Sequence, residues 1–197
     1  YADAKKANGK YDEAYIEYNN YKEMVPDDSR GLNGITSCEL AQEWIDNPSR
    51  YEVNNVVLIN STEADFSPVY AKKNYKVLAF TSSRDGTLGK ETDGTSGQNF
   101  TDLWETKVDR KGKWSTPVLV EGAVNSEYND GAATFDKKYS SMYFTRCPVS
   151  QSPQNPCQIY TAKRKGRSWD SPKLVPLTSD SFTVGHPSIS IDNMQLF

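Results

Sequence analysis

Few side chains in this 197-residue chain belong to the types that usually do chemistry, because it contains one histidine and three cysteines. That is too few His and Cys ligands for a credible zinc cluster. The single imidazole, His186, lies between Gly185 and Pro187, and no nucleophile-elbow motif accompanies it. Ser82 and Ser83 offer hydroxyl groups, but no base stands beside them in the sequence. The sequence therefore predicts that the chain is not an enzyme and has no catalytic residue, metal site or cofactor.

Two of the cysteines are placed to form a covalent link. Cys147 and Cys157 bracket a loop that joins two expected strands, so the ends of the loop must lie close together. In an oxidising compartment this arrangement favours a disulfide, and two free thiols are the alternative. Closing a loop of this length would stabilise the fold by roughly 2–3 kcal/mol in the chain-entropy treatment. Cys38 is left over, and its helical context predicts a small buried residue and not a reactive thiol.

The elements that position these residues begin with a helical segment over residues 1–50. Ala14, Tyr18 and Tyr21 are spaced i, i+4 and i+7 and therefore share one helix face. A further helical stretch is expected over about 29–45. Its predicted buried face consists of Leu32, Ile35, Leu40, Ala41 and Trp44.

The periodicity changes over residues 51–197, where short runs rich in Tyr, Phe, Val and Thr are separated by turn-forming residues. These runs repeat. Trp114 is matched by Trp169 and Pro117 by Pro172, each Trp follows a Lys-Gly turn, and a run ending in Phe-Thr lies upstream in both copies. About four antiparallel strands per repeat, with Trp and Pro at fixed positions, are typical of a β-propeller blade.

The repeats define the predicted domain organisation. Two nearly complete blades, over about 56–122 and 123–177, are followed by the opening strands of a third. Each blade buries its apolar faces against its neighbours, so this number of blades leaves two faces open. The predicted fold class is α+β, with helices followed by an incomplete propeller. Because the chain starts at Tyr1 and stops within an apolar alternation, we expect it to be a piece of a longer protein.

Three polar residues mark the inner strands of this predicted propeller. Asp65 and Asp130 occupy matching positions at the start of an inner strand, and His186 lies near the start of the third copy. Inner strands line a propeller's central channel, so one interpretation places Asp65, Asp130 and His186 in a ring at the channel mouth that binds a peptide or an ion. The other interpretation is structural: the carboxylates cap turns by accepting backbone N–H groups, and His186 is part of the fold.

Charge and hydrophobicity argue against nucleic-acid binding and against a membrane span. Lys and Arg number 23 against 26 Asp and Glu, for a net charge of −3. Without a dense basic block, the chain is a poor candidate for nucleic-acid binding. The longest aliphatic run, Val56–Ile59, falls far short of the ~20 residues that cross a bilayer, so no membrane span is predicted.

Both halves of the chain resemble known repeat families. The segment from Asp65 to Tyr70 together with the segment from Val77 to Arg84 resembles the WD40-like PD40 propeller repeat of TolB-like periplasmic proteins and of multidomain outer-membrane proteins of Bacteroidetes. The second copy departs from that motif over residues 131–133, where Gly-Ala-Ala replaces an aromatic, Ser and Pro. The helical segment is similar to a tetratricopeptide repeat, with a plain helical hairpin as the alternative. The positions that match the second helix of that repeat are Gly9, Tyr11, Ala14, Tyr18 and Pro26.

A tetratricopeptide segment followed by such blades resembles the OmpA-family lipoproteins of the type IX secretion system. The resemblance implies a protein-interaction scaffold in the periplasm, associated with the outer membrane, whose partners are proteins of the secretion and envelope machinery. Peptidoglycan would be bound only through a domain absent from these residues. A periplasmic location also supports the disulfide between Cys147 and Cys157. Two alternatives remain: the propeller of a serine peptidase, and a TolB-like propeller that binds a peptide or a sugar.

Overall fold

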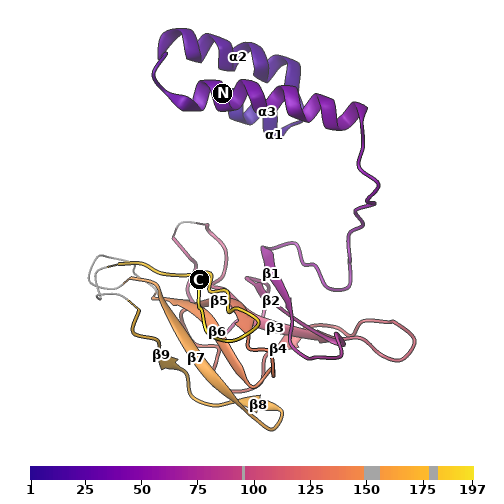
Figure 1. Cartoon of the computed structure of the whole chain (residues 1–197), viewed down its shortest axis with the longest axis vertical. Coiled ribbons are helices and arrows are strands. Elements are labelled where there is room, and N and C mark those ends of the chain that lie inside the picture. Colours follow the sequence, from indigo (N-terminus) through magenta and orange to yellow (C-terminus); the bar gives the residue numbers. More distant parts are fainter. Residues whose placement is uncertain (95, 149–155, 178–181) are drawn as a thin grey trace. The chain divides into compact units, whose positions relative to one another are not determined.

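The structure is a computed structural model in which the chain forms two compact units, Tyr1–Asn54 and Asn55–Phe197 (Figure 1). It describes residues 1–94, 96–148, 156–177 and 182–197. The first unit is helical and the second consists of antiparallel strands in curled sheets, which gives the mixed α+β class expected from the sequence. Within these described ranges, no helix combines the length and the hydrophobicity needed to cross a membrane.

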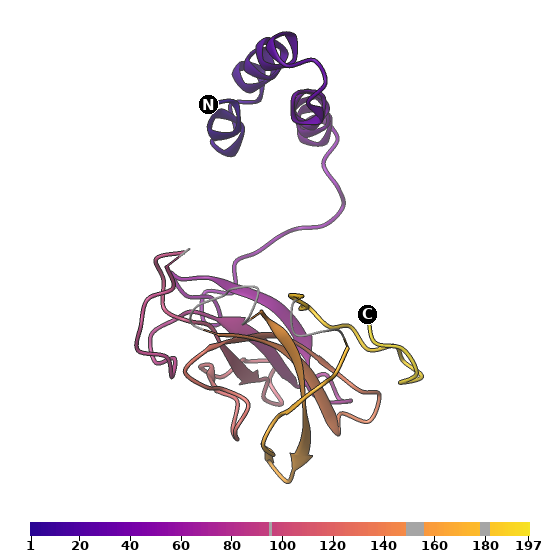
Figure 2. The same ribbon diagram turned by 90° about the vertical axis from the view of Figure 1, so that its left-hand side faces the viewer.

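The helical unit contains α1 (Ala2–Ala7), α2 (Tyr11–Met24) and α3 (Ser29–Asp46), shown in indigo and violet in Figure 2. Gly9 separates the first two helices because it adopts a φ of +72°, which a side chain disfavours. Asp28 caps α3 by accepting the backbone N–H of Arg30 at 2.9 Å.

The core of this unit is small and depends on a close approach of α2 to α3. Ala14, Tyr18, Ile35 and Cys38 are buried together. The prediction of a buried Cys38 is therefore confirmed, and so is that of a buried Ile35. The prediction for Leu32, Leu40 and Trp44 was wrong, since these side chains are 52%, 38% and 66% exposed. The helix instead turns a stripe of small residues toward α2: Gly34 lies directly beneath the Tyr18 ring, which leaves no room for larger side chains there.

The first sheet has the order β1-β2-β3-β4, with all neighbours antiparallel. Its strands are β1 (Asp65–Tyr70), β2 (Val77–Ser82), β3 (Asp102–Lys107) and β4 (Val118–Leu119). The second sheet has the order β5-β6-β7-β8, and β9 also pairs with β7. Its strands are β5 (Asn129–Phe135), β6 (Ser141–Cys147), β7 (Gln158–Lys165), β8 (Ser168–Trp169) and β9 (Lys173–Leu174).

The two sheets are copies of one design in register as well as in strand order. Phe80 pairs with Trp104 in the first sheet, and Phe144 pairs with Tyr160 at the equivalent position of the second. The first strand of each sheet, β1 and β5, carries an irregularity at the same place, between Phe66 and Val69 and between Gly131 and Thr134. These two strands are called the inner strands below.

A shared core fills the space between the sheets. Residues of the first sheet and the segment after it meet the second sheet in one buried cluster: Leu103, Val120, Val124, Ala133, Met142, Phe144, Ala162 and Trp169. Trp169 is 4% exposed and packs against Phe135 at 5.6 Å between ring centroids. After β9 the chain ends in a short paired segment, where Ile189 bridges Leu196.

Candidate functional site

The two aspartates singled out from the sequence form equivalent ion pairs inside their sheets. Asp65 Oδ1 lies 2.5 Å from Arg84 Nη2, and Asp130 Oδ1 lies 2.6 Å from Arg146 Nε. Each guanidinium also lies over aromatic rings of its own sheet, Phe80 and Trp104 for Arg84, Phe144 and Tyr160 for Arg146. Each arginine therefore links the first strand of its sheet, through the aspartate, to the second and third strands, through the aromatic rings.

The loop before each inner strand completes this arrangement. Ser61 donates its hydroxyl to Asp65 at 2.9 Å, and Ser126 donates its hydroxyl to Asp130 at 2.6 Å. The arginines donate to carbonyl oxygens of the same loops, Ile59 O and Val124 O. The contacts between serine and aspartate follow a recurring aliphatic-Asn-Ser-x-x-x-Asp motif, at 59–65 and 124–130, which was present in the sequence and could have predicted them.

The two carboxyl groups differ in their electrostatic surroundings. Burial raises the pKa of Asp65, but hydrogen bonds from Ser61, Ser82 and Arg84 outweigh burial and leave that pKa below its usual range. Asp130 is completely buried, and burial raises its pKa against the opposing effect of Arg146. Both carboxylates accept hydrogen bonds from a serine and an arginine, and Asp65 also accepts the backbone N–H of Ser61.

His186 lies in the segment after β9, which is not a regular strand, and it does not occupy the position of the aspartates. Its backbone N–H donates to Thr145 Oγ1 at 2.8 Å, just as the Ala132 N–H donates to Thr81 Oγ1 at 2.8 Å. Both residues have a positive φ, 56° for His186 and 49° for Ala132, and Ser67 in the first copy has 50°. His186 is thus equivalent to Ala132 and Ser67. The structure does not bring the three predicted channel-mouth residues together as one set of free polar groups.

A cavity of about 290 Å³ lies beside these strand ends, and His186 lines it. It is called the polar cavity for its amide and hydroxyl side chains, although much of its exposed wall is apolar. Its walls come from the starts of β1 and β5, the loop between β2 and β3, and the His186 segment. Most of the lining side chains are uncharged donors and acceptors, and half-exposed Phe66 adds an aromatic surface. The lining consists of Ala64, Phe66, Ser83, Asp93, Ser96, Gln98, Asn99, Thr101, Asn129, Gly131, Ala132, Thr145, Cys147 and His186.

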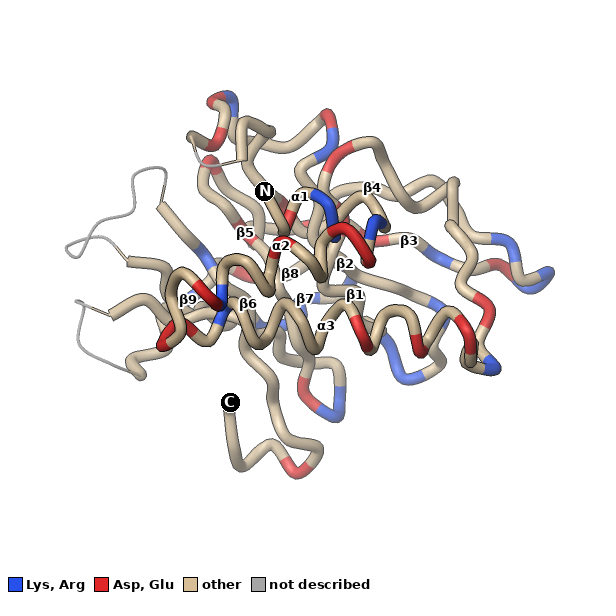
Figure 3. Tube along the Cα trace, turned by 90° about the horizontal axis from the view of Figure 1, so that it is seen from above, with Lys and Arg blue, Asp and Glu red and all other residues tan. Residues whose placement is uncertain are grey.

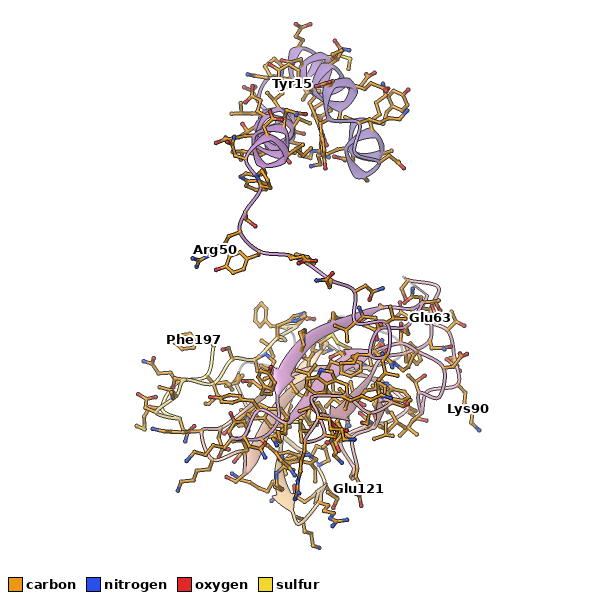
Figure 4. All side chains as sticks on the ribbon, turned by 90° about the vertical axis from the view of Figure 1, so that its right-hand side faces the viewer. Tyr15, Arg50, Glu63, Lys90, Glu121 and Phe197 are labelled. Carbon is orange, nitrogen blue, oxygen red and sulfur yellow. A yellow bond between two sulfur atoms is a disulfide. The ribbon has the colours of Figure 1, made fainter. Side chains whose placement is uncertain are left out.

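Hydrogen bonds hold two of the cavity's amide side chains in place. Gln98 Oε1 accepts from Ser83 Oγ at 2.7 Å and from the Ala64 N–H at 3.2 Å. Asn129 Oδ1 accepts from the Thr101 N–H at 2.9 Å. These residues were not recognised from the sequence, because no motif distinguishes them from ordinary loop residues. Figure 4 shows the side chains of this unit packed around the strands.

A disulfide forms part of the cavity wall. Cys147 and Cys157 are joined, with 4.1 Å between their Cα atoms. The Cys157 carbonyl accepts the Val184 N–H at 3.0 Å, in the same way that the Thr101 carbonyl accepts the Asp130 N–H at 2.8 Å. The disulfide thus joins the strand ends on which the third inner segment docks. Residues 149–155 of the loop that it closes lie outside the described residues.

The helical unit has a groove of its own, of about 650 Å³, between α1, α2 and α3. Its floor includes Tyr18, whose hydroxyl donates to Asp3. Burial and the Asp3 carboxylate raise the pKa of Tyr18 to about 12. Lys6 and Arg30 also line this groove.

In the part of the chain that the structure describes, no three His, Cys, Asp or Glu residues are grouped so that they could hold a metal ion. Searches against protein-family models, curated proteins and solved structures found no match.

Proposed function

We propose that this chain is a non-enzymatic protein-interaction scaffold of the bacterial cell envelope. In this proposal the helical unit is a tetratricopeptide-like segment and the two sheets are blades of a WD40-like propeller that is incomplete in this chain. The finer assignment is a periplasmic component of the type IX secretion system, associated with the outer membrane, which connects the machinery to the outer membrane and the peptidoglycan. The sequence resemblance is the basis of that finer assignment.

One structural observation supports the scaffold proposal most directly. The contact between the first and second sheets, from Thr81 to the Ala132 N–H, is repeated from Thr145 to the His186 N–H. The same contact therefore holds β5 on the first sheet and the His186 segment on the second, as successive contacts do in stacked repeats. Stacking places the connecting loops of successive repeats side by side, and the polar cavity lies among those loops. Such loops on a rigid framework are common sites for binding partners.

The polar cavity also supports a second candidate, a propeller that binds a peptide or a sugar. Amide and hydroxyl groups beside an aromatic ring can form hydrogen bonds and stacking contacts with either ligand. Thermal unfolding with a panel of short peptides and oligosaccharides tests this candidate, because a ligand that binds only the folded protein raises the melting temperature.

Site-specific photo-crosslinking in living cells tests the scaffold proposal. A photoreactive amino acid would replace Ser96, which lines the cavity and is exposed. The control would carry it at Lys113, an exposed residue of the β3–β4 turn at the opposite end of the sheet. We expect a discrete crosslink from position 96 to an envelope protein, identified by mass spectrometry, and none from position 113. The absence of any crosslink from position 96, or identical products from both positions, would contradict the proposal.

A further inference from the structure

The turns at the other end of the two sheets carry a repeated pair of lysines. Lys72 and Lys73 lie in the turn from β1 to β2, and Lys137 and Lys138 lie in the turn from β5 to β6. The lysines are exposed. Figure 3 marks Lys and Arg in blue, and many of them lie in turns between strands. The shared turn design thus gives each sheet the same cluster of positive charge at the same end.

Arg164 of β7 brings the two turns together. Its Nη2 donates to the Ala71 carbonyl at 3.1 Å, and its Nε donates to the Tyr139 carbonyl at 2.8 Å. The guanidinium lies 4.2 Å from the centroid of the Trp169 ring. Burial lowers the pKa of Arg164, and the negative charges of Glu105 and Asp136 oppose this effect. The partners of Arg164 are two carbonyl groups and an aromatic ring, so its charge is held in place without being neutralised by direct contact.

The result is a depression of about 350 Å³, the basic depression, lined by Lys72, Lys73, Asn74, Lys138, Tyr139 and Arg164. Among the described residues, none of its four cations forms an ion pair within 4.0 Å. The nearby carboxylates are engaged elsewhere. Glu105 pairs with Lys107 at 2.8 Å. Asp136 accepts hydrogen bonds from Ser140 and Ser141, and these keep its pKa low against the effect of burial.

This concentration of positive charge contrasts with the chain as a whole, whose net charge is −3. Unpaired cations around a concave site favour a ligand that brings several negative charges into it. Asn74 and Tyr139 add hydrogen-bonding groups. Tyr70 and Tyr75, which contact each other edge to face with 5.2 Å between centroids, add an aromatic surface at the same turn. An acidic peptide supplies carboxylates for the cations, and it supplies carbonyl oxygens and aliphatic carbons for these neighbouring groups.

We propose that the basic depression binds an acidic segment of a partner protein, rich in Glu and Asp side chains. The proposal rests on the proposed function only in taking the partner to be a protein. Its site lies at the opposite end of the strands from the polar cavity, so the two can be tested separately.

The binding test uses fluorescence anisotropy with a labelled peptide of alternating Glu and Ser, and with a Gln/Ser peptide of equal length as the neutral control. The test variant combines Lys73→Glu with Lys138→Glu. The matched control combines Lys22→Glu with Lys90→Glu, which changes the net charge equally at exposed sites outside the depression. Thermal unfolding of each variant establishes that it is folded. A second variant, Lys73→Gln with Lys138→Gln, removes charge without reversing it.

We expect the wild-type chain and the matched control to bind the acidic peptide with similar affinity, and to bind less tightly as salt is added. The depression variants should bind at least about fivefold more weakly. Equal binding by the test and control variants would overturn the proposal. The proposal would also be overturned if the chain did not bind the acidic peptide but bound vesicles containing anionic lipid, and if that binding depended on Lys73 and Lys138. Crosslinking from position 96 does not depend on these lysines, so loss of peptide binding alone leaves the scaffold proposal standing.

Discussion

The side chain of Thr81 occupies the space that a side chain at Gly131 would need. A β-carbon added to Gly131 would lie 2.5 Å from the Thr81 methyl carbon. The hydroxyl of the same threonine accepts the N–H of Ala132. The relationship is repeated, less tightly, between Thr145 and Gly185, where the added β-carbon would lie 3.2 Å away. One threonine in each sheet therefore fixes the segment that packs on that sheet by a methyl contact and a hydrogen bond.

Replacing Gly131 by alanine should loosen this contact between the sheets. We expect Gly131→Ala to lower the free energy of unfolding by about 1–3 kcal/mol, because the added methyl group overpacks a buried site. The measurement is urea denaturation followed by tryptophan fluorescence. Gly94→Ala is the control, since a β-carbon at Gly94 meets nothing within 4 Å. Adding Thr81→Ser, which removes the obstructing methyl group, should restore part of the loss. A Gly131→Ala variant as stable as the control would contradict this account of the contact.

The disulfide should stabilise the unit that contains the sheets. Replacing Cys147 and Cys157 together by serine should lower the free energy of unfolding by roughly 2–3 kcal/mol, because the unfolded chain regains the freedom of the open loop. A reducing agent should destabilise the wild-type chain by a similar amount and leave the double variant unchanged. Equal shifts of both denaturation curves by the reducing agent would contradict this prediction, because the loss of stability would then not come from reduction of this disulfide.

Repetition in the sequence predicted much of the strand pattern, because each copy carries its own turn and Phe-Thr signals. The recurrence of Phe-Thr is now explained: Phe144 belongs to the core between the sheets, while Thr81 and Thr145 accept the N–H groups of Ala132 in β5 and of His186. The ion pairs of Asp65 and Asp130 were not predicted, because Arg84 and Arg146 differ in their distance along the chain from the strand residues that they accompany. Only the fold places them equivalently.

The helical half shows where periodicity was insufficient. Leu32, Leu40 and Trp44 are hydrophobic enough to suggest a buried face, yet α3 packs through Gly34, Ile35 and Cys38. A prediction from hydrophobicity selects large apolar side chains for burial, whereas the contact with Tyr18 requires a glycine, which has no side chain. The basic depression and the polar cavity could not be predicted from the sequence either, because each combines loops from different copies of the repeat.

The contact between Gly34 and Tyr18 leads to a prediction for the helical unit. A β-carbon at Gly34 would lie 2.3 Å from the Tyr18 ring, so Gly34→Ala should separate α2 from α3. Alanine favours a helix over glycine by about 1 kcal/mol, but we expect the overlap to outweigh this gain. The Gly34→Ala variant should therefore lose its helical signal at a lower temperature than the wild type, as measured by far-UV circular dichroism. Asn33→Ala, at the exposed neighbouring position, gives the propensity gain without the overlap and should be neutral or stabilising. Equal melting of the two variants would show that α2 and α3 do not require this close approach.

Asp102 should make the stability of the sheets depend on pH. It is 1% exposed, and its Oδ2 accepts the Leu88 N–H at 2.7 Å. Its Oδ1 has no hydrogen-bond partner among the described residues. Burial raises the pKa of this carboxyl to about 7 from its ordinary value of 3.8, with a smaller contribution from the charge of Asp130. Folding therefore favours the protonated form.

Because the folded-state pKa lies above the unfolded-state pKa, this stabilising contribution is complete below the ordinary aspartate pKa and is lost as the pH rises toward about 7. The Asp102→Asn variant keeps an oxygen for the Leu88 N–H and does not titrate. Between about pH 5 and about pH 7 we expect it to gain on the order of 1–2 kcal/mol in unfolding free energy relative to the wild type, with little further change at higher pH. Urea denaturation across this range measures the difference. Parallel stability curves for the two proteins would contradict this prediction. They would show that Asp102 is already ionised in the folded chain at the lower pH, so that burial of its Oδ1 does not disfavour the charged form.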